Sequence, residues 1–472
     1  MIKDSIHSIH FIGICGTAMA NVAVQLKKLG YIVTGSDENV YPPMSTFLVE
    51  NGIHPQEGYH EKHLEPAPDL VVVGNAISRG NAEAENTLEK KLFYLSLPDV
   101  IREFFIRGKQ SVVVSGTHGK TTTTSLLAWV LDSAGKNPGF LIGGIPKNFG
   151  QGMRISDGPQ FIIEGDEYDT AFFDKRSKFL HYLPDIAIVN NIEFDHADIF
   201  RSIEDIKLTF SRLINLIPRN GLLVINGDDL IVRELAKKSF APVVSFGFRS
   251  DVQWHLDGLR PSGEGIRFRL SENGHLPTEF YLPLTGHHSA LNAAGVIVVA
   301  RHLGLSDETI QKGLNTFQGV RRRLEVCGVV RDITVYDDFA HHPTAIRETL
   351  EGVVARFPEN RVWALFEPRT NTTRRNIFQK EFPLAFEKAY GVAIGKINRP
   401  HLLKEAEKLD REQIVADLKK MGKPAMFSDS VEEIIAWLVP QTKPGDKIVV
   451  MSNGSFDGIY EKLLGALEKS GQ

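Results

Sequence analysis

The sequence predicts an α/β protein of three domains built on parallel sheets. Short apolar, β-branched runs recur along its 472 residues, and many lead at once into a glycine-containing or acidic loop. Segments of helical periodicity follow several of these loops. Such alternation is typical of parallel sheets with helices on both faces, and a chain of this length divides into about three domains.

Composition and charge narrow the class of protein. The chain is 42% hydrophobic and 24% charged, which is ordinary for a globular protein. Its formal net charge of -4 gives no reason to expect binding to nucleic acid or to a membrane surface. Cys15 and Cys327 lie far apart and predict neither a disulfide framework nor a zinc site. The sequence shows no signal peptide and no apolar run of membrane-spanning length, so we expect a cytoplasmic protein without membrane insertion.

The first elements in chain order form a βαβ unit. We expect a strand over residues 9–14, a helix over 17–29 that Gly30 closes, and a second strand over 31–34. A further apolar run at residues 70–73 predicts another strand of the same sheet. Ligands of open α/β sheets bind at the carboxyl edge of the strands, so the loops after these strands are candidate binding loops.

These loops carry small residues and one acid. Gly13 and Gly16 are placed like the glycines of a dinucleotide-binding loop, and Asp37 falls about where a ribose-binding acid is found. Asn75 and Ala76 follow the strand at residues 70–73. The spacing G-x-x-G is not the complete dinucleotide pattern, so a nicotinamide cofactor and a different nucleotide diphosphate both remain possible ligands.

The loop after the predicted strand that ends at Val114 has the composition of a phosphate-binding loop. Gly116 and Gly119 allow backbone N–H groups to surround phosphate oxygens, and the following helix adds the positive end of its dipole. Lys120 is placed to reach terminal phosphates, and the Thr121 hydroxyl to ligate Mg²⁺. The full pattern G-x-x-x-x-G-K-[ST] needs glycine where Val114 stands, so the match is to a shortened G-x-x-G-K-T. A chance Gly-Lys-Thr in a tight turn is the alternative.

Two further predicted strands of the central segment end in acidic or imidazole groups. Glu164-Gly-Asp-Glu-Tyr-Asp169 directly follows one strand, and His196 lies in the loop after the next. In a parallel sheet both strand ends lie beside the phosphate loop. The Glu164 carboxylate with nucleotide phosphates is enough to hold one Mg²⁺, and His196 is a candidate for a second metal position. The alternatives are a solvated acidic loop and, for His196, a strand cap or an ion pair with Asp195 or Asp198.

The rest of the chain continues the alternation with one interruption. Residues 243–284 have few helix signals and several short alternating pieces, which predicts antiparallel β structure or an extension of the sheet. A loop and a small-residue helix follow at 285–295, where Asn292 either offers an amide to an adenine edge or is an ordinary satisfied polar residue. The three arginines 321–323 are either a solvated basic patch or include a phosphate contact.

Taken together, these motifs resemble those of the Mur ligases, the ATP-dependent amide ligases of peptidoglycan synthesis. The resemblance covers essentially the whole chain in six ordered motifs: Gly116-Thr-His-Gly-Lys-Thr-Thr-Thr-Thr124, Glu164-Gly-Asp-Glu-Tyr-Asp169, Asn191-Ile-Glu-Phe-Asp-His196, Gly286-His-His-Ser-Ala-Leu-Asn292, Gly319-Val-Arg-Arg-Arg-Leu-Glu325 and Asp337-Asp-Phe-Ala-His-His-Pro343. It implies a Rossmann-like N-terminal domain over residues 1–108, a central P-loop ATPase-like domain over 109–317 and a C-terminal Rossmann-like domain over 318–472. The first would bind the sugar nucleotide, and the last would close over ATP and bind the amine substrate.

The resemblance also implies roles for individual residues. The catalytic residues would be Lys120, Glu164, His196 and Arg323, and the metal ligands Thr121, Glu164 and His196. The ATP-binding residues would be Gly116, Thr117, His118, Gly119, Lys120, Thr121, Thr122, Asn292, Arg323 and Asp338. The UDP-sugar-binding residues would be Gly13, Cys15, Gly16, Thr17, Ser36, Asp37, Asn75 and Ala76. Beyond the family motifs, we hypothesise that Arg369 or Arg374 contacts carboxylates of a peptide substrate.

Within the family, the loops at Gly13 and Gly35 resemble the branch whose first domain binds UDP-N-acetylmuramate. Three stretches favour members that add an intact peptide: Gly13-Ile-Cys-Gly-Thr-Ala-Met19, Asn39-Val-Tyr-Pro-Pro-Met-Ser-Thr46 and Met451-Ser-Asn-Gly-Ser-Phe-Asp-Gly458. The resemblance implies ATP and Mg²⁺, with L-alanyl-γ-D-glutamyl-meso-diaminopimelate joined to the lactyl carboxylate through an acyl phosphate in cell-wall recycling. Free L-alanine as the amine, in de novo synthesis, is the alternative.

Two further expectations concern the metal-bridging lysine and the oligomeric state. Some family members bridge their metals with a carbamylated lysine; the matching position here is Phe210, so we expect no carbamate and a surface position for Lys207. We expect a monomer or a weak homodimer. A nicotinamide oxidoreductase and a non-catalytic nucleotide-binding switch are the competing functional classes.

Overall fold

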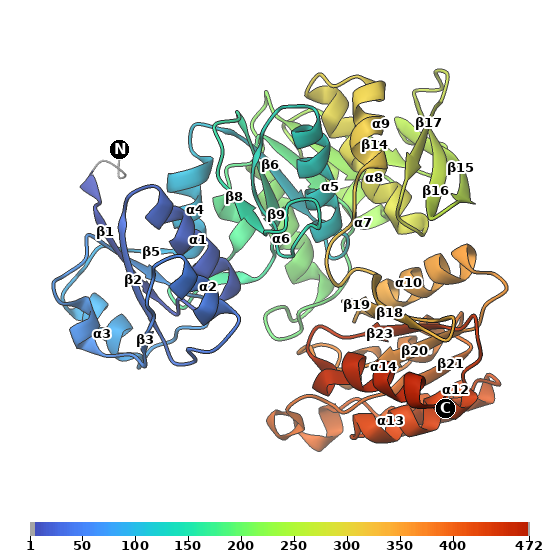
Figure 1. Ribbon diagram of the computed structural model, residues 1–472. Coiled ribbons are helices and arrows are strands. Elements are labelled where there is room, and N and C mark those ends of the chain that lie inside the picture. The colour runs from blue at the N-terminus through green and yellow to red at the C-terminus, as the bar shows by residue number, and fades with distance from the viewer. Residues whose placement is uncertain (1–4, 471–472) are drawn as a thin grey trace. The chain divides into compact units, whose positions relative to one another are not determined.

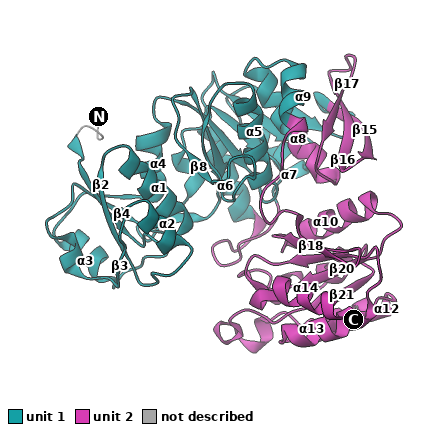
Figure 2. Ribbon diagram, in the orientation of Figure 1, with its two compact units in different colours: residues 1–192, 204–254, 295–313 teal, residues 193–203, 255–294, 314–472 magenta. Residues whose placement is uncertain are grey.

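The structure is a computed structural model that describes residues 5–470 (Figure 1). The chain forms two compact units, coloured separately in Figure 2. Unit 1 comprises the residues up to 192, 204–254 and 295–313, and unit 2 comprises 193–203, 255–294 and the residues from 314 onward. Within the described residues, no helix is both long and apolar enough to cross a membrane.

The first sheet of unit 1 is fully parallel, with strand order β3-β2-β1-β4-β5. Its strands are β1 (Ser8–Ile12), β2 (Ile32–Asp37), β3 (Gln56–Glu57), β4 (Leu70–Val73) and β5 (Tyr94–Ser96). Its helices are α1 (Thr17–Lys28), α2 (Met44–Glu50), α3 (Ala82–Glu89) and α4 (Leu97–Ile101). The central strands β1 and β4 are almost entirely buried, as expected for a parallel sheet covered on both faces.

The second sheet of unit 1 contains the strand order β14-β13-β12-β6-β9-β7-β8. These strands are β6 (Gln110–Ser115), β7 (Gly139–Leu141), β8 (Met153–Arg154), β9 (Gln160–Gly165), β12 (Ile186–Val189), β13 (Leu222–Asn226) and β14 (Val243–Gly247). The associated helices are α5 (Lys120–Ser133), α6 (Ile203–Asn215), α7 (Leu230–Ala236) and α9 (Asp307–Asn315), and a small antiparallel pair joins β10 (Asp169–Ala171) to β11 (Asp174–Ser177). β6 pairs in parallel with both β9 and β12, so the strand ends predicted to meet do meet.

Unit 2 contains an antiparallel hairpin and a third sheet. The strands β15 (Trp254–Ser262), β16 (Gly265–Glu272) and β17 (Thr278–Leu282) lead into α8 (His287–His302), which contributes residues to both units. The third sheet has the order β18-β19-β23-β20-β21-β22, with only β18 antiparallel to its neighbour. Its strands are β18 (Glu325–Val330), β19 (Ile333–Asp338), β20 (Val362–Phe366), β21 (Gly391–Ile394), β22 (Ala425–Phe427) and β23 (Lys447–Met451).

Helices pack on both faces of this third sheet and form its two hydrophobic cores. They are α10 (Pro343–Arg356), α11 (Glu381–Ala385), α12 (Arg411–Lys420), α13 (Val431–Leu438) and α14 (Ile459–Lys469). Three parallel-rich sheets confirm the predicted α/β class with its three-part organisation. Both interpretations of residues 243–284 are correct for different parts: β14 extends the parallel sheet, whereas β16 and β17 pair antiparallel. The boundaries at residues 108 and 317 stay a prediction.

Candidate active site

The glycine loop between β6 and α5 has a backbone that requires its glycines. Gly116 has φ 139° and Gly119, the residue before α5, has φ 80°, both in the region that side chains disfavour. A Cβ atom on Gly116 would lie 3.1 Å from the Cβ of Asn190 and from backbone atoms of Asn191. The loop is therefore closely packed against the end of β12, and a side chain at Gly116 would disturb it.

Two asparagines at the end of β12 hold this loop. The Asn191 carbonyl accepts a hydrogen bond from the Thr117 N–H at 2.9 Å, and its side-chain oxygen accepts one from the His118 N–H at 2.7 Å. The Asn190 amide donates to the Thr123 hydroxyl at 3.1 Å. No role for these asparagines is predicted from the sequence, although they immediately follow a predicted strand beside the phosphate loop.

Lys120 is held at the loop by a buried carboxylate. Its ammonium donates to the Gly116 carbonyl at 2.7 Å and to both carboxylate oxygens of Glu167 at 2.8 and 2.9 Å. The two side chains are 13% and 3% exposed. Burial alone lowers the pKa of Lys120, but the Glu167 carboxylate outweighs it and the pKa is raised. Lys120 is thus a cation held at the glycine loop, and its contact with a nucleotide phosphate stays a prediction. Its partner Glu167 was not predicted from the sequence.

Glu164 faces the first turn of α5. The Thr121 hydroxyl donates to one of its carboxylate oxygens at 2.9 Å, and the Gly143 N–H donates to the other at 2.7 Å. Burial raises the pKa of Glu164, against the nearby Lys120 charge and these donors. A hydroxyl and a carboxylate side by side at a phosphate loop are the hard oxygen donors that Mg²⁺ prefers, so Thr121 and Glu164 fit the predicted metal position.

The other acids of this motif have separate partners. Asp166 pairs with Lys178 at 2.6 Å, and although burial opposes it, this cation keeps the pKa of Asp166 below its ordinary value. Glu164, Asp166 and Glu167 thus face a hydroxyl and two different cations. The motif is therefore not simply a solvated acidic loop, because each of the three carboxylates has a partner and Glu167 is only 3% exposed.

The first glycine loop, between β1 and α1, is held by the end of β2. The Gly13 and Ile14 N–H groups both donate to the Ser36 carbonyl, at 2.8 and 3.0 Å, and the Cys15 N–H donates to the Asp37 carboxylate at 2.9 Å. Gly13 has φ 85°. Burial and the Asp37 charge raise the pKa of the Cys15 thiol to about 11, so Cys15 is not a reactive thiolate near neutral pH.

The loop after β4 lies beside this first glycine loop. The Gly74 N–H donates to the Ile12 carbonyl at 3.0 Å, and a Cβ on Gly13 would lie 3.4 Å from the Ile77 side chain. The predicted residues Asn75 and Ala76 are therefore next to Gly13. Ser36 is fully buried and its hydroxyl donates to Glu83 at 2.5 Å, and its assignment to the UDP-sugar site stays a prediction.

In unit 2, the predicted residues Arg323 and Asp338 lie at the carboxyl edge of the third sheet. Asp338 is buried and accepts the N–H groups of Leu324 at 2.7 Å and Ala340 at 2.8 Å; burial raises its pKa, against the charge of Arg323. The neighbouring Arg322 is a structural anchor that donates to Asp337 and to two backbone carbonyls. The arginine triplet is therefore not simply a solvated basic patch.

The start of α8 borders a cavity of about 320 Å³ lined by His287, His288, Arg347, Glu348 and Glu351. Asn292, one turn further along α8, is 7% exposed. Asn292 does not line this cavity, and its assignment to an adenine edge stays a prediction.

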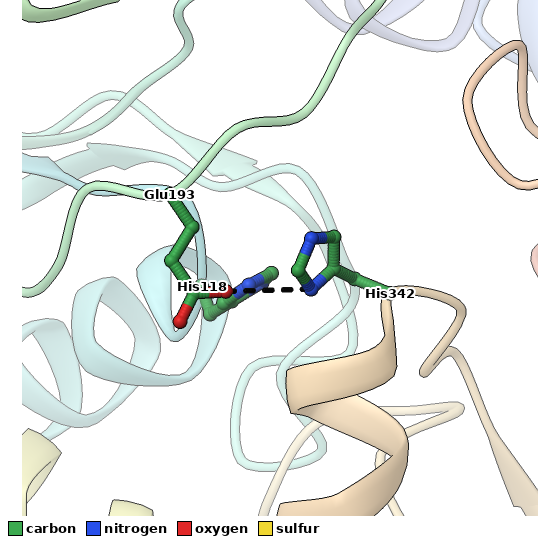
Figure 3. Close-up of side chains that lie close together, drawn as sticks. All are labelled: His118, Glu193 and His342. Atoms are coloured by element: carbon green, nitrogen blue, oxygen red, sulfur yellow. Dashed lines mark ion pairs between the residues drawn. The ribbon is translucent and has the colours of Figure 1, made fainter. Parts of the chain in front are cut away.

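His196 lies in the part of the loop after β12 that belongs to unit 2. Its backbone N–H donates to the Asp195 carboxylate at 2.7 Å, and its ring nitrogen Nδ1 lies 4.0 Å from the same oxygen, so an ion pair with Asp195 stays the alternative. The same loop contacts α10 through Glu193, which pairs with Nδ1 of His342 at 3.4 Å (Figure 3). A metal role for His196 stays a prediction.

The two arginines hypothesised to bind peptide differ in exposure. Arg374 is 7% exposed and donates to the Asn398 carbonyl at 3.2 Å and to the Asn371 side chain. Arg369 is more exposed and donates to Glu367 at 3.4 Å. Arg369 is therefore the better placed of the two to reach a ligand.

The position predicted to replace a bridging lysine is fully buried. Phe210 is 0% exposed on α6, and its correspondence to the carbamylated lysine of other family members stays a prediction. Lys207, one turn earlier, pairs with Glu204 at 2.8 Å near the surface of the same helix.

A glycine loop at a strand–helix junction, with a buried lysine and a hydroxyl–carboxylate pair, defines a nucleotide-phosphate-binding enzyme of the P-loop class. Comparison with protein families narrows this class to one family. Residues 8–108 match the Mur ligase family catalytic domain, 114–300 the Mur ligase middle domain, and 322–454 the Mur ligase glutamate ligase domain. The chain therefore belongs to the Mur ligase family and is an ATP-dependent ligase.

Full-length relatives are similar along the whole chain. The UDP-N-acetylmuramate–L-alanyl-γ-D-glutamyl-meso-2,6-diaminoheptandioate ligase of Haemophilus influenzae is 43% identical over 98% of this chain and 99% of its own length. A UDP-N-acetylmuramate–L-alanine ligase of Halorhodospira halophila is 31% identical over 99% of this chain and 95% of its own length. The crystal structure of a murein peptide ligase from Psychrobacter arcticus is 37% identical, has a TM-score of 0.71, and covers 98% of this chain and 99% of that one.

Proposed function

We propose that this protein joins L-alanyl-γ-D-glutamyl-meso-diaminopimelate to the lactyl carboxylate of UDP-N-acetylmuramate, using ATP, in the recycling of cell-wall peptides. The observation that carries the proposal is the Lys120 and Glu164 site, at which the Lys120 ammonium and the Thr121 hydroxyl each face a carboxylate of the acidic motif. The full-length similarity to ligases of this type supports the choice of substrates. The use of ATP supports a cytoplasmic location for the reaction.

The chemistry follows from the poor reactivity of a carboxylate. The lactyl carboxylate attacks the γ-phosphorus of ATP, and ADP leaves with the electrons of the broken P–O bond. The peptide amine then attacks the carbonyl carbon of the acyl phosphate, loses a proton, and phosphate leaves. An acyl phosphate is needed because hydroxide is too poor a leaving group for direct amide formation.

Residues of this chain would stabilise the phosphoryl transfer. Lys120 offers a cation already fixed by Glu167, so little reorganisation is needed when negative charge develops. Thr121 and Glu164 would hold Mg²⁺, which when bound neutralises charge on the phosphate oxygens. Arg323 is the further cation that we assign to the transferred phosphate, and His196 to a second metal position.

The choice of amine is supported by the difference between the two kinds of relative. Identity is 43% to the relative named for the tripeptide and 31% to the one named for L-alanine, at similar coverage. Ligation of L-alanine in de novo synthesis is the second candidate, because that relative also aligns along the whole chain.

The deciding experiment is phosphate release from ATP with Mg²⁺ and UDP-N-acetylmuramate, with either the tripeptide or L-alanine as the amine. We expect kcat/KM to be higher for the tripeptide by about a hundredfold or more, because a site built for several carboxylates leaves its cations unpaired with L-alanine. Preference for L-alanine would favour the second candidate. No phosphate release with either amine would contradict the ligase assignment of these substrates.

A further inference from the structure

A buried carboxylate lies behind the first glycine loop. Glu83, in the first turn of α3, is 0% exposed and receives the Ser36 hydroxyl at 2.5 Å and the His60 N–H at 3.1 Å. Ring nitrogens of His63 and His10 lie 2.7 and 3.2 Å from its two oxygens. Since an ionised carboxylate only accepts hydrogen bonds, both contacts are hydrogen bonds in the tautomers that carry the proton on these two nitrogens.

The four donors come from three segments: two strands of the first sheet and one connection between strands. His10 is on β1, Ser36 is on β2, and His60 and His63 belong to the segment between β3 and β4. Burial alone raises the pKa of Glu83, but the donors from His10, Ser36 and His63 outweigh it and hold the pKa below its ordinary value. Glu83 is therefore a charged centre that ties these segments together.

Ser36 connects this centre to the glycine loop. Its hydroxyl donates to Glu83, while its carbonyl accepts the N–H groups of both Gly13 and Ile14. The following residue, Asp37, accepts the Cys15 N–H. Three successive amides of the loop thus depend on residues 36 and 37, and Glu83 fixes the first of these.

The loop fixed in this way opens onto the N-terminus of α1. Gly16 is the residue before α1 and has no side chain to cap the helix, so the first-turn amides point toward any ligand at this end. A buried carboxylate costs desolvation energy that an apolar side chain of similar size would avoid. Glu83 meets this cost through its surrounding donors, and one of them, Ser36, also holds the glycine loop.

We propose that Glu83 is a positioning residue for the sugar nucleotide, holding Ser36 so that the Gly13–Gly16 loop already has the shape that binds a nucleotide diphosphate. The inference rests on the proposed function, because it takes UDP-N-acetylmuramate as the ligand of this loop. A preformed loop loses less conformational freedom on binding, and so raises affinity without a direct contact.

The test compares Glu83→Gln with Glu85→Gln in the full-length protein. Glu83→Gln keeps the size of the side chain but removes its charge and replaces one acceptor by an amide that clashes with the surrounding donors. Glu85, two residues along the same helix, pairs with Arg79 and the Gly80 N–H at the surface and is the matched control. Isothermal titration calorimetry measures the Kd for UDP-N-acetylmuramate, and steady-state kinetics measures kcat and the KM for ATP.

We expect Glu83→Gln to raise this Kd by about tenfold or more, through loss of charge-assisted hydrogen bonds. The KM for ATP, and kcat at saturating sugar nucleotide, should stay within about twofold of the unchanged protein, and Glu85→Gln should alter none of the three values. Ser36→Ala should also raise the Kd for UDP-N-acetylmuramate. The double variant that combines both changes should bind no more weakly than Glu83→Gln alone, because both changes break the same hydrogen bond.

Each contrary result has a distinct meaning. A lower melting temperature with an unchanged Kd in Glu83→Gln would make Glu83 merely structural and overturn the proposal, as would an equal rise in the KM for ATP. If Glu83→Gln does not fold, an unchanged Kd in Ser36→Ala overturns it. Failure of the unchanged protein to bind UDP-N-acetylmuramate overturns the proposed function and this inference together, whereas normal binding in both variants overturns the inference alone.

Discussion

The two glycine loops of unit 1 share a local plan and differ in charge. Each follows a buried parallel strand, has the spacing G-x-x-G and leads into a helix: Gly13 to Gly16 before α1, and Gly116 to Gly119 before α5. The second loop continues into Lys120, which Glu167 holds in place. The first continues into Thr17 and is held by Ser36 and Asp37 from the neighbouring strand.

This difference in charge matches the two fates of a bound phosphate group, which is either held in place or transferred. A diphosphate that is only held can be bound by backbone amides and a helix dipole. A phosphoryl group that is transferred develops extra charge in the transition state, which a prepositioned cation stabilises. A buried cation in turn needs a counter-ion when phosphate is absent, and Glu167 supplies it. The carboxylates behind the two loops therefore also differ. Glu167 pairs with a cation, whereas Glu83 is surrounded by a hydroxyl, a backbone N–H and two imidazole rings.

Removing the cation of the second loop should have the largest effect. We expect Lys120→Ala to lower kcat for phosphate release by about 10³-fold or more, because charge on the transferred phosphoryl group loses its cation. It also removes the cation that faces the buried Glu167 carboxylate, which should lower the free energy of unfolding by about 3–5 kcal/mol. Thermal unfolding and phosphate release measure the two effects separately.

The double variant Lys120→Met with Glu167→Gln separates stability from catalysis. It removes both buried charges, so it should recover most of the lost stability while remaining inactive. Substantial turnover in this variant would show that the lysine does not serve phosphoryl transfer.

Changing the hydroxyl–carboxylate pair should have the next largest effect. Glu164→Gln removes the charged oxygen beside Thr121, so we expect kcat to fall by about 10²-fold and the Mg²⁺ concentration for half-maximal activity to rise. The surface variant Glu204→Gln, which removes the pair with Lys207, is the control and should change neither value. An unaltered Mg²⁺ dependence in Glu164→Gln would argue against a metal at this position.

Replacing one glycine by alanine in each loop should weaken the binding of one ligand and not of the other. Gly116→Ala meets backbone and side-chain atoms at 3.1 Å with φ 139°, and Gly13→Ala meets a movable Ile77 side chain at 3.4 Å with φ 85°. Alanine in such a conformation costs about 1–3 kcal/mol of strain. We therefore expect Gly116→Ala to raise the KM for ATP. Gly13→Ala should raise the Kd for UDP-N-acetylmuramate by a smaller factor, because the side chain that it meets can move. If each variant weakened both ligands equally, the two loops would not be separate sites.

The smallest effect concerns the Cys15 thiol of the first loop. Because its pKa is raised to about 11, the thiolate fraction at pH 8 is smaller than for an ordinary thiol of pKa about 8.5. In a Cys327→Ser background, alkylation by iodoacetamide should be slow at pH 8 and should accelerate as the pH rises toward 11. The unfolded chain should react at the ordinary rate, and rapid labelling of the folded protein at pH 7 would contradict the raised pKa.

Sequence analysis was most successful where the signal is local. The strand and helix around Gly116 follow from a β-branched run, two glycines and helical periodicity, and the structure places them as expected. Parallel topology then brought Glu164 to the phosphate loop, because neighbouring parallel strands end at the same edge. Partner choice within the acidic motif was not predictable, since Glu164 and Glu167 have the same chemistry and lie three residues apart.

The sequence by itself determined the α/β class, the two glycine loops and the presence of a lysine, a hydroxyl and an acidic motif for phosphate chemistry, because each depends on residues close together in the chain. Only the tertiary structure decided that Glu167 pairs with Lys120, that Asn191 holds the loop, and that Glu83 lies behind Gly13. These contacts join segments separated by 47 to 73 residues, and which buried polar group meets which depends on how helices and strands pack.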